Sequence, residues 1–147
     1  MTKPLAVITG ASSGIGEATA KAFSNAGYPT LLLARRIEIM ESFNLKNSIC
    51  KKIDVRDRDA LVSAIREAEK QYGPTDMMFN NAGVARLADI STQDPSEWDE
   101  MIDVNTKGVM NGIYAVMKDM KARQSGTIVN MSSVSYTHLT LPTMEFV

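Results

Sequence analysis

The sequence predicts an α/β fold, a Rossmann-like doubly wound parallel sheet flanked by helices. Two observations carry this prediction. Apolar segments of strand length alternate with amphipathic segments of helix length, and a glycine-rich loop joins the first strand to the first helix. Strands that alternate with helices of this length form β-α-β units, whose strands run parallel. The crossovers are expected to be right-handed.

The boundaries of the expected elements follow from apolar periodicity and from capping residues. Gly27 ends the first helix as a C-terminal cap, Asp57 caps the third helix, and Gly73 and Pro74 end that helix. Ser96 starts a long fourth helix. The expected strands cover residues 5–9, 30–34, 49–55, 76–80 and 127–131, and the expected helices cover residues 15–26, 37–45, 60–72 and 98–123.

Composition and charge exclude several classes of function. The net charge of −1 gives the chain no global field that favours nucleic acid or an anionic membrane. The single cysteine, Cys50, excludes an internal disulfide framework and a cysteine-based metal cluster, and it favours a cytoplasmic location. The longest apolar stretches are too short for a membrane span or a signal sequence. We expect one domain and no metal site.

The glycine-rich loop is the strongest local signal of function. In a parallel sheet, the loop after the first strand faces a crevice, and the next helix points its free N–H groups and its dipole at a bound phosphate. The first glycine allows a tight turn, the second lets the backbone approach a pyrophosphate, and the third lets the helix pack close to the strand. A tight turn with incidental glycines is the alternative. The candidate cofactor-binding residues of this loop are Gly10, Ser12, Ser13, Gly14, Ile15 and Gly16.

Four further motifs accompany the loop in a fixed order. NNAG at 80–83 follows the fourth strand, Asp-Val at 54–55 ends the third, DVN at 103–105 lies in the long helix, and NMSS at 130–133 ends the fifth strand. With the glycine spacing T-G-x-x-x-G-x-G, residues 5–133 resemble the short-chain dehydrogenases/reductases. Taken singly, each motif has an ordinary structural explanation, such as a turn, a helix cap or a strand end.

The resemblance implies roles for residues in these motifs. It implies that Asn105 holds a water in a proton relay and that the Ser133 hydroxyl orients the substrate oxygen. It also implies a nicotinamide dinucleotide as the cofactor. The cofactor contacts implied outside the glycine loop are Asp54, Val55, Asn81, Ala82 and Gly83.

The end of the second strand favours NADP(H) over NAD(H). An acidic residue at this position usually accepts a hydrogen bond from the ribose 2′-hydroxyl of NAD. This chain has Ala34 there, followed by Arg35 and Arg36. A guanidinium can bind a 2′-phosphate through paired charge-assisted hydrogen bonds, whereas a carboxylate repels it. The alternative is that both arginines are simply solvated at a helix start.

The implied reaction is hydride transfer between the nicotinamide and a small alcohol or carbonyl substrate. In the family, a tyrosine with a lysine four residues later exchanges the substrate proton, roughly a dozen residues after the serine. Tyr136 comes only three residues after Ser133, Thr140 occupies the lysine position, and no lysine follows Lys121. We therefore expect the catalytic tyrosine and lysine to be absent and assign Tyr136 no role. The resemblance implies that the parent protein is a homo-oligomer.

Residues 134–147 are expected to be non-native. The segment begins VSYTHLTLPT, which corresponds to a translated transposon-type sequencing adapter; a genuine C-terminal tail is the alternative. The adapter reading also supplies part of the Ser133 codon, so that serine is not independently established. The nucleotide-binding domain then covers residues 1–133 and is incomplete, with the sheet truncated after its fifth strand in the order 3-2-1-4-5.

The function expected for the parent protein is that of an NADP(H)-dependent oxidoreductase, and this chain is expected to be inactive. Two alternatives stay open: a non-catalytic NAD(P)-binding module, and a truncated product with no function of its own. A Tyr-x-x-x-Lys pair in the native downstream sequence favours the enzyme. Stabilisation of the fold by NADP separates a binding fragment from a functionless one.

Overall fold

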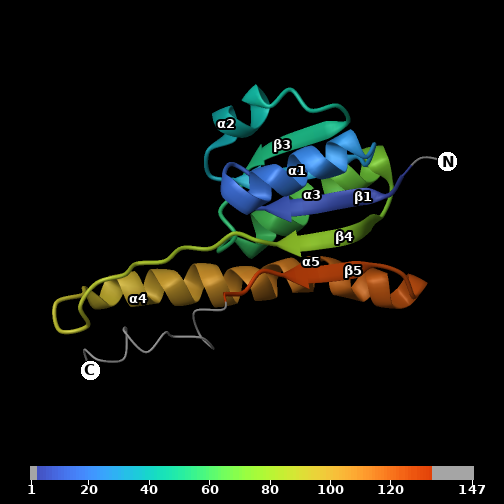
Figure 1. The fold of residues 1–147 in the computed structure, drawn as a ribbon. Helices are drawn as coiled ribbons and strands as arrows, with labels where there is room; N and C mark the ends of the chain where they lie inside the picture. Colours follow the sequence, from blue (N-terminus) through green and yellow to red (C-terminus); the bar gives the residue numbers. More distant parts are fainter. Residues whose placement is uncertain (1–2, 134–147) are drawn as a thin grey trace.

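A five-stranded, all-parallel sheet of order β3-β2-β1-β4-β5 forms the centre of the molecule (Figure 1). The structure is a computed structural model that describes residues 3–133. The predicted fold class and strand order are confirmed. The strands are β1 (Leu5–Thr9), β2 (Thr30–Ala34), β3 (Ser48–Lys52), β4 (Thr75–Asn80) and β5 (Thr127–Asn130).

Helices cover both faces of this sheet, as a doubly wound fold requires. The helical segments are α1 (Gly14–Asn25), α2 (Ile37–Ser42), α3 (Arg58–Tyr72), α4 (Pro95–Ile102), the π-helical segment η1 (Asp103–Lys107) and α5 (Gly108–Arg123). Helices α1 and α2 pack on one face, and α3 and α5 pack on the other. None of the helices in the described part of the chain is long and apolar enough to cross a membrane.

The alternation of side chains along β2 shows how the sheet builds two cores. Leu31 and Leu33 point into the core beneath α3 and α5, whereas Leu32 and Ala34 point into the core beneath α1 and α2. Successive strand residues face opposite sides, so a continuously apolar strand must be covered on both. Each fully buried leucine contributes roughly 1.5–3 kcal/mol by leaving water. The central strands therefore fix the orientation of the loops at their ends.

The third strand is shorter than predicted. It ends at Lys52 instead of residue 55, because the chain turns after Ile53 and the Asp57 amide donates to the Asp54 carbonyl at 2.9 Å. The predicted cap is present: the Asp57 carboxylate accepts from the Ala60 amide. The turn brings Val55 toward the carboxyl end of the sheet.

The predicted long helix is a composite of α4, η1 and α5. It starts earlier than predicted, at Pro95, where the Asp94 side chain accepts from the Ser96 amide. The π-helical turn occupies residues 103–107 and contains the DVN motif. Such insertions are rare and often occur at functional sites. The sequence pattern did not indicate this turn, because the turn is associated with a contact between Asn105 and the distant Val84 backbone.

Two glycines and a buried asparagine let α5 approach the sheet and the β3–α3 loop closely. A Cβ on Gly112 would lie 1.9 Å from the Asn80 side-chain oxygen, and a Cβ on Gly108 would lie 2.6 Å from Val55. Buried Asn111 donates to the Val55 carbonyl at 2.8 Å and accepts from the Arg58 guanidinium at 2.9 Å. These contacts hold the β3–α3 loop against the helix.

Candidate functional site

The loops that follow β1, β2, β3 and β4 enclose a cavity of about 420 Å³ at the carboxyl end of the sheet. Eleven of the predicted site residues line it, namely Gly10, Ser12, Ser13, Ile15, Arg35, Arg36, Asp54, Val55, Asn81, Ala82 and Gly83. Gly14, Gly16, Asn105 and Ser133 do not line it. Segments far apart in the sequence therefore meet at the crevice where an open α/β sheet binds its ligands.

The glycine loop has the tight geometry that its spacing predicts. Gly10 has a φ of +63°, and a Cβ there would lie 2.8 Å from the Ala82 backbone. A Cβ on Gly16 would lie 2.3 Å from the Gly10 carbonyl oxygen, so only glycine lets α1 pack this close to β1. Gly14 has a φ of +57° and nothing within 4 Å of its Cβ position. The loop is therefore tightly packed at Gly10 and Gly16 and open at Gly14.

Thr9 and Asn81 join the loop after β1 to the loop after β4. The Thr9 hydroxyl accepts from the amides of Asn81 and Ala82, both at 3.0 Å. The Asn81 side-chain amide donates to the Thr9 carbonyl at 3.0 Å and to the Gly10 carbonyl at 3.3 Å. Thr9 is buried, so these hydrogen bonds are sheltered from water. They fix the two walls of the cavity relative to each other.

The N-terminus of α1 is suited to an anion. Ser13 occupies the N-cap position, yet its side chain accepts no hydrogen bond from the helix. The first-turn N–H groups of a helix need acceptors from outside it. The Arg36 guanidinium donates to the hydroxyls of Ser12 at 3.2 Å and Ser13 at 3.1 Å, which places a positive charge beside them. Hydroxyls, helix dipole and guanidinium together fit a phosphate group.

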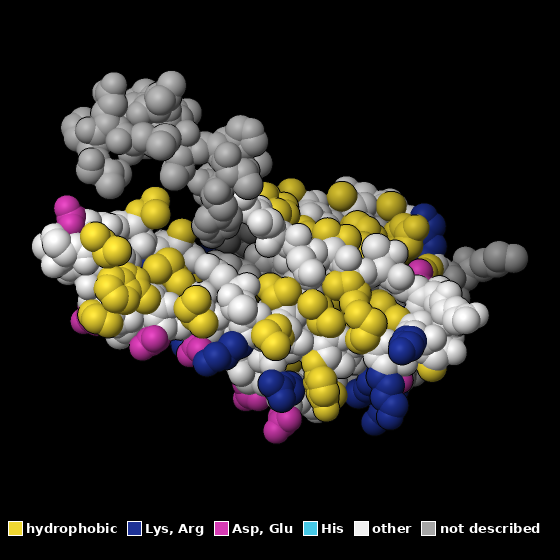
Figure 2. All heavy atoms as spheres, turned by 90° about the horizontal axis from the view of Figure 1, so that it is seen from below, with side chains coloured by type: hydrophobic (Ala, Val, Ile, Leu, Met, Phe, Trp, Pro, Cys, Tyr) yellow, Lys and Arg dark blue, Asp and Glu magenta, His cyan; other side chains and the backbone are white. Residues whose placement is uncertain are grey.

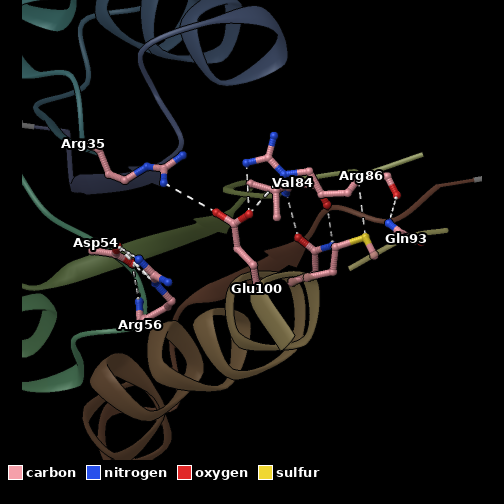
Figure 3. Close-up of polar contacts among 9 residues, drawn as sticks. Arg35, Asp54, Arg56, Val84, Arg86, Gln93 and Glu100 are labelled. Carbon is pink, nitrogen blue, oxygen red and sulfur yellow. Dashed lines mark hydrogen bonds and ion pairs between the residues drawn. The ribbon is translucent and has the colours of Figure 1, made fainter. Parts of the chain in front are cut away.

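Two arginine–carboxylate pairs lie at the rim of the cavity (Figure 3). Arg35 forms an ion pair with Glu100 of α4 at 3.9 Å, and Asp54 receives hydrogen bonds from the Arg56 guanidinium at 2.6–3.1 Å. The hydrogen bond from Arg56 is the largest cause that lowers the pKa of the Asp54 carboxyl, and the charge of Arg35 lowers it a little further. Asp54 is thus ionised and already occupied by a partner.

Asn105 faces the backbone of the β4–α4 loop and does not line the cavity. Its side-chain oxygen accepts from the Val84 amide, and its side-chain nitrogen donates to the Val84 carbonyl, both at 2.8 Å. Both ends of the amide are therefore occupied in this structure. The π-helical turn carries Asn105 and so sets the position of the loop that follows Gly83.

This chain is similar in sequence and in structure to known proteins. Residues 4–141 match the family model described as short chain dehydrogenase. The chain belongs to the short-chain dehydrogenase family. It is 41% identical over 135 residues to an uncharacterized oxidoreductase of Listeria monocytogenes, covering 88% of this chain and 54% of that protein. It thus spans about half the length of the curated relatives it matches.

Two solved structures show the same architecture. The apo form of LigO from Sphingobium sp. strain SYK-6 superposes with a TM-score of 0.86 at 32% identity, covering 95% of this chain and 55% of that chain. A metagenomic short-chain oxidoreductase solved in complex with NADP gives a TM-score of 0.84 at 30% identity, covering 93% of this chain and 65% of that one.

The last of the family-like motifs lies at the edge of the described region. Ser133 is the final described residue and is exposed, while Met131, two residues earlier, lines the cavity. Tyr136 and the adapter-like segment lie outside the described residues. The family match includes residues 134–141, so the domain boundary at residue 133 stays a prediction.

Several residues of the site were missed by the sequence analysis. Thr9 is the first residue of the T-G-x-x-x-G-x-G motif, but it was assigned no role of its own; a polar residue at the end of a buried strand was the available signal. Asn111 carried no signal, because nothing in the sequence shows that its helix face is buried. The lining residues outside the predicted site set are Leu33, Ala34, Ile53, Val84, Val104 and Met131, of which Ala34 was expected beside the cofactor ribose and Val84 at the border of the pocket.

Proposed function

We propose that this chain binds NADP(H) in the cavity at the carboxyl end of its sheet. We further propose that it is the nucleotide-binding part of an oxidoreductase that transfers hydride between the nicotinamide and an alcohol or carbonyl substrate. One observation carries the proposal: the uncapped N-terminus of α1 meets two serine hydroxyls and the Arg36 guanidinium at the open side of the glycine loop. We propose that these groups form a phosphate site built from two segments, the β1–α1 loop with the start of α1 and the residues that follow β2.

Two features support NADP(H) over NAD(H). Ala34 stands where a carboxylate would accept from a ribose 2′-hydroxyl, so the site lacks the usual NAD-selective group. Arg35 and Arg36 both line the cavity and add two positive charges beside that position. The structural relative that holds NADP is consistent with this preference.

In this proposal the chain's own residues bind the cofactor and orient it. When bound, the nicotinamide supplies or accepts the hydride. The serines and Arg36 hold phosphate oxygens, and the Thr9–Asn81 contacts keep the glycine loop and the β4 loop at a fixed separation. Asn105 holds Val84, which lines the same cavity. Because no Tyr-x-x-x-Lys pair follows Ser133 in the sequence, we propose that this chain binds the cofactor without turning it over.

The exposed faces of α4 and α5 support the proposal that the parent protein self-associates. Figure 2 shows apolar side chains gathered on the face of the molecule that these helices form. A contiguous exposed apolar surface commonly marks a protein interface. Its large members are Trp98, Ile102, Met110, Tyr114 and Met117, which are 38–65% exposed.

Titration with NADPH tests the proposed function. The chain is expected to raise and blue-shift NADPH fluorescence in a saturable manner, because the cavity shields the ligand from water. In the same preparation, a panel of aldehydes and ketones is expected to produce no steady NADPH oxidation. Absence of saturable binding contradicts the proposed site. Steady turnover contradicts the proposal that the chain is inactive and leaves the binding proposal intact.

A further inference from the structure

Glu100 lies between two arginines at the rim of the cavity (Figure 3). One carboxylate oxygen accepts from the Arg86 guanidinium twice, at 3.0 and 3.1 Å. The other oxygen faces a terminal nitrogen of Arg35 at 3.9 Å. The Glu100 side chain is only 22% exposed, so water screens these charges less than at an open surface.

The two contacts of Glu100 differ in kind. The contact with Arg86 is a pair of charge-assisted hydrogen bonds, whereas the contact with Arg35 is electrostatic only, because 3.9 Å exceeds hydrogen-bonding distance. Within residues 3–133, Arg35 donates no hydrogen bond, and its side chain is 58% exposed. Its donors thus remain available while its charge is partly neutralised by Glu100.

A ribose 2′-phosphate needs the same guanidinium. It would carry up to two negative charges into a space where Glu100 already supplies one, and like charges at such distances repel. Asp54, the other carboxylate at the rim, is not an equivalent competitor. Both carboxylate oxygens of Asp54 accept hydrogen bonds from the Arg56 guanidinium, whereas Arg86 donates to one oxygen of Glu100 and leaves the other facing Arg35. Glu100 is therefore the group whose charge opposes the phosphate.

We propose that Glu100 is a specificity-determining residue that competes with a ribose 2′-phosphate for Arg35. Phosphate binding moves Arg35 from Glu100 to the ligand, and Arg86 retains the carboxylate. This inference rests on the proposed NADP(H) site. It implies that Glu100 weakens the binding of NADP but leaves the binding of NAD unchanged. Glu100 therefore reduces the preference for NADP over NAD that the arginines create. Arg86 limits this effect because it neutralises part of the Glu100 charge.

Calorimetric titration of the whole chain with NADP⁺ and with NAD⁺ tests the inference. Glu100→Gln is expected to tighten NADP⁺ binding about fivefold, the size expected from removing one charge near a partly exposed anion site. NAD⁺ binding is expected to change less than twofold. Glu97→Gln is the matched control: it removes the same charge from the same helix at a side chain that contacts neither arginine, and it is expected to leave both affinities unchanged.

A second variant tests the inference with the opposite sign and does not depend on how Glu100→Gln folds. Arg86→Gln leaves the Glu100 charge unneutralised, so NADP⁺ binding is expected to weaken about threefold, again with NAD⁺ nearly unchanged. If wild type binds NADP⁺ but Glu100→Gln matches Glu97→Gln, or binds NADP⁺ more weakly, the competition is contradicted and the nucleotide site stands. If no variant binds either dinucleotide, both the site and the competition are contradicted.

Discussion

At the scale of single residues, the glycine loop needs glycine for two separate reasons: close packing at one position and a left-handed backbone conformation at another. Gly16 has an ordinary backbone conformation, but its Cβ position lies 2.3 Å from a backbone oxygen. Gly14 has a positive φ, but open space surrounds its Cβ position. A methyl group is therefore unfavourable at both positions, for different physical reasons and to different extents.

Alanine substitutions at these two glycines are expected to separate the effects. Gly16→Ala forces α1 away from β1 and is expected to lower the free energy of unfolding by about 2–3 kcal/mol. Gly14→Ala places an L-residue in the left-handed region and is expected to lower it by about 1 kcal/mol. Urea denaturation measures both. Equal losses, or a larger loss at Gly14, contradict the packing geometry.

Asp54 gives the stability of the chain a dependence on pH. Its pKa is lowered in the folded state, chiefly by the hydrogen bond from Arg56, so the ionised form stabilises the fold at pH values above the ordinary carboxyl pKa of about 3.9. This contribution is lost as pH falls through the lowered folded-state pKa. Asp54→Asn is therefore expected to be less stable than wild type at pH 7, with the difference shrinking below about pH 4. A difference that grows on acidification has the wrong sign for this account.

At the scale of elements, the structure separates what periodicity can predict from what it cannot. Strands β1 and β2 lie at their predicted positions because burial on both faces leaves an unbroken apolar run. The π-helical turn at residues 103–107 escaped prediction because its cause is tertiary: it carries Asn105 against the Val84 backbone. Likewise, Asn111 is buried only because the β3–α3 loop folds over it. Predicting these two features would have required knowledge of contacts between distant segments, which local sequence patterns do not contain.

The contact between η1 and the β4–α4 loop is expected to control the mobility of that loop. Asn105→Ala removes both hydrogen bonds to Val84, each worth roughly 0.5–1.5 kcal/mol. Hydrogen exchange of the Val84 amide is therefore expected to accelerate at least tenfold. Asn105→Asp keeps the acceptor for that amide and loses the donor, so it is expected to show a smaller acceleration. Unchanged exchange in Asn105→Ala contradicts this role.

At the scale of the whole molecule, the sheet order and the position of the site could be predicted because parallel topology brings every strand's carboxyl end to one edge. Eleven of the predicted site residues line the cavity for that reason. Val104, in contrast, comes from the π-helical segment η1, whose approach to the sheet no local pattern encodes. The ion pairs at the rim could not be predicted from a local pattern either, because Glu100 lies more than sixty residues after Arg35 in the sequence.

The exposed apolar face of α4 and α5 is expected to make the chain self-associate. The Met110 side chain is among its most exposed large members, at 61%. Met110→Glu places a charge in the middle of this face and is expected to keep the chain monomeric in sedimentation equilibrium, whereas the mass of wild type is expected to rise with concentration. Lys118→Glu introduces the same acidic group at an exposed position that is not apolar and serves as the control. Identical masses for wild type and Met110→Glu argue against an interface here.

Selectivity between the two nicotinamide dinucleotides tests the central claim most directly, because the arginines at the end of β2 should distinguish a 2′-phosphate from a hydroxyl. Calorimetric titration of the unmodified chain at one fixed salt concentration gives both dissociation constants. The account predicts that NADP⁺ binds at least about tenfold more tightly than NAD⁺, the effect of roughly 1.4 kcal/mol from one charge-assisted contact. Equal affinities, tighter binding of NAD⁺, or no binding of either would contradict it.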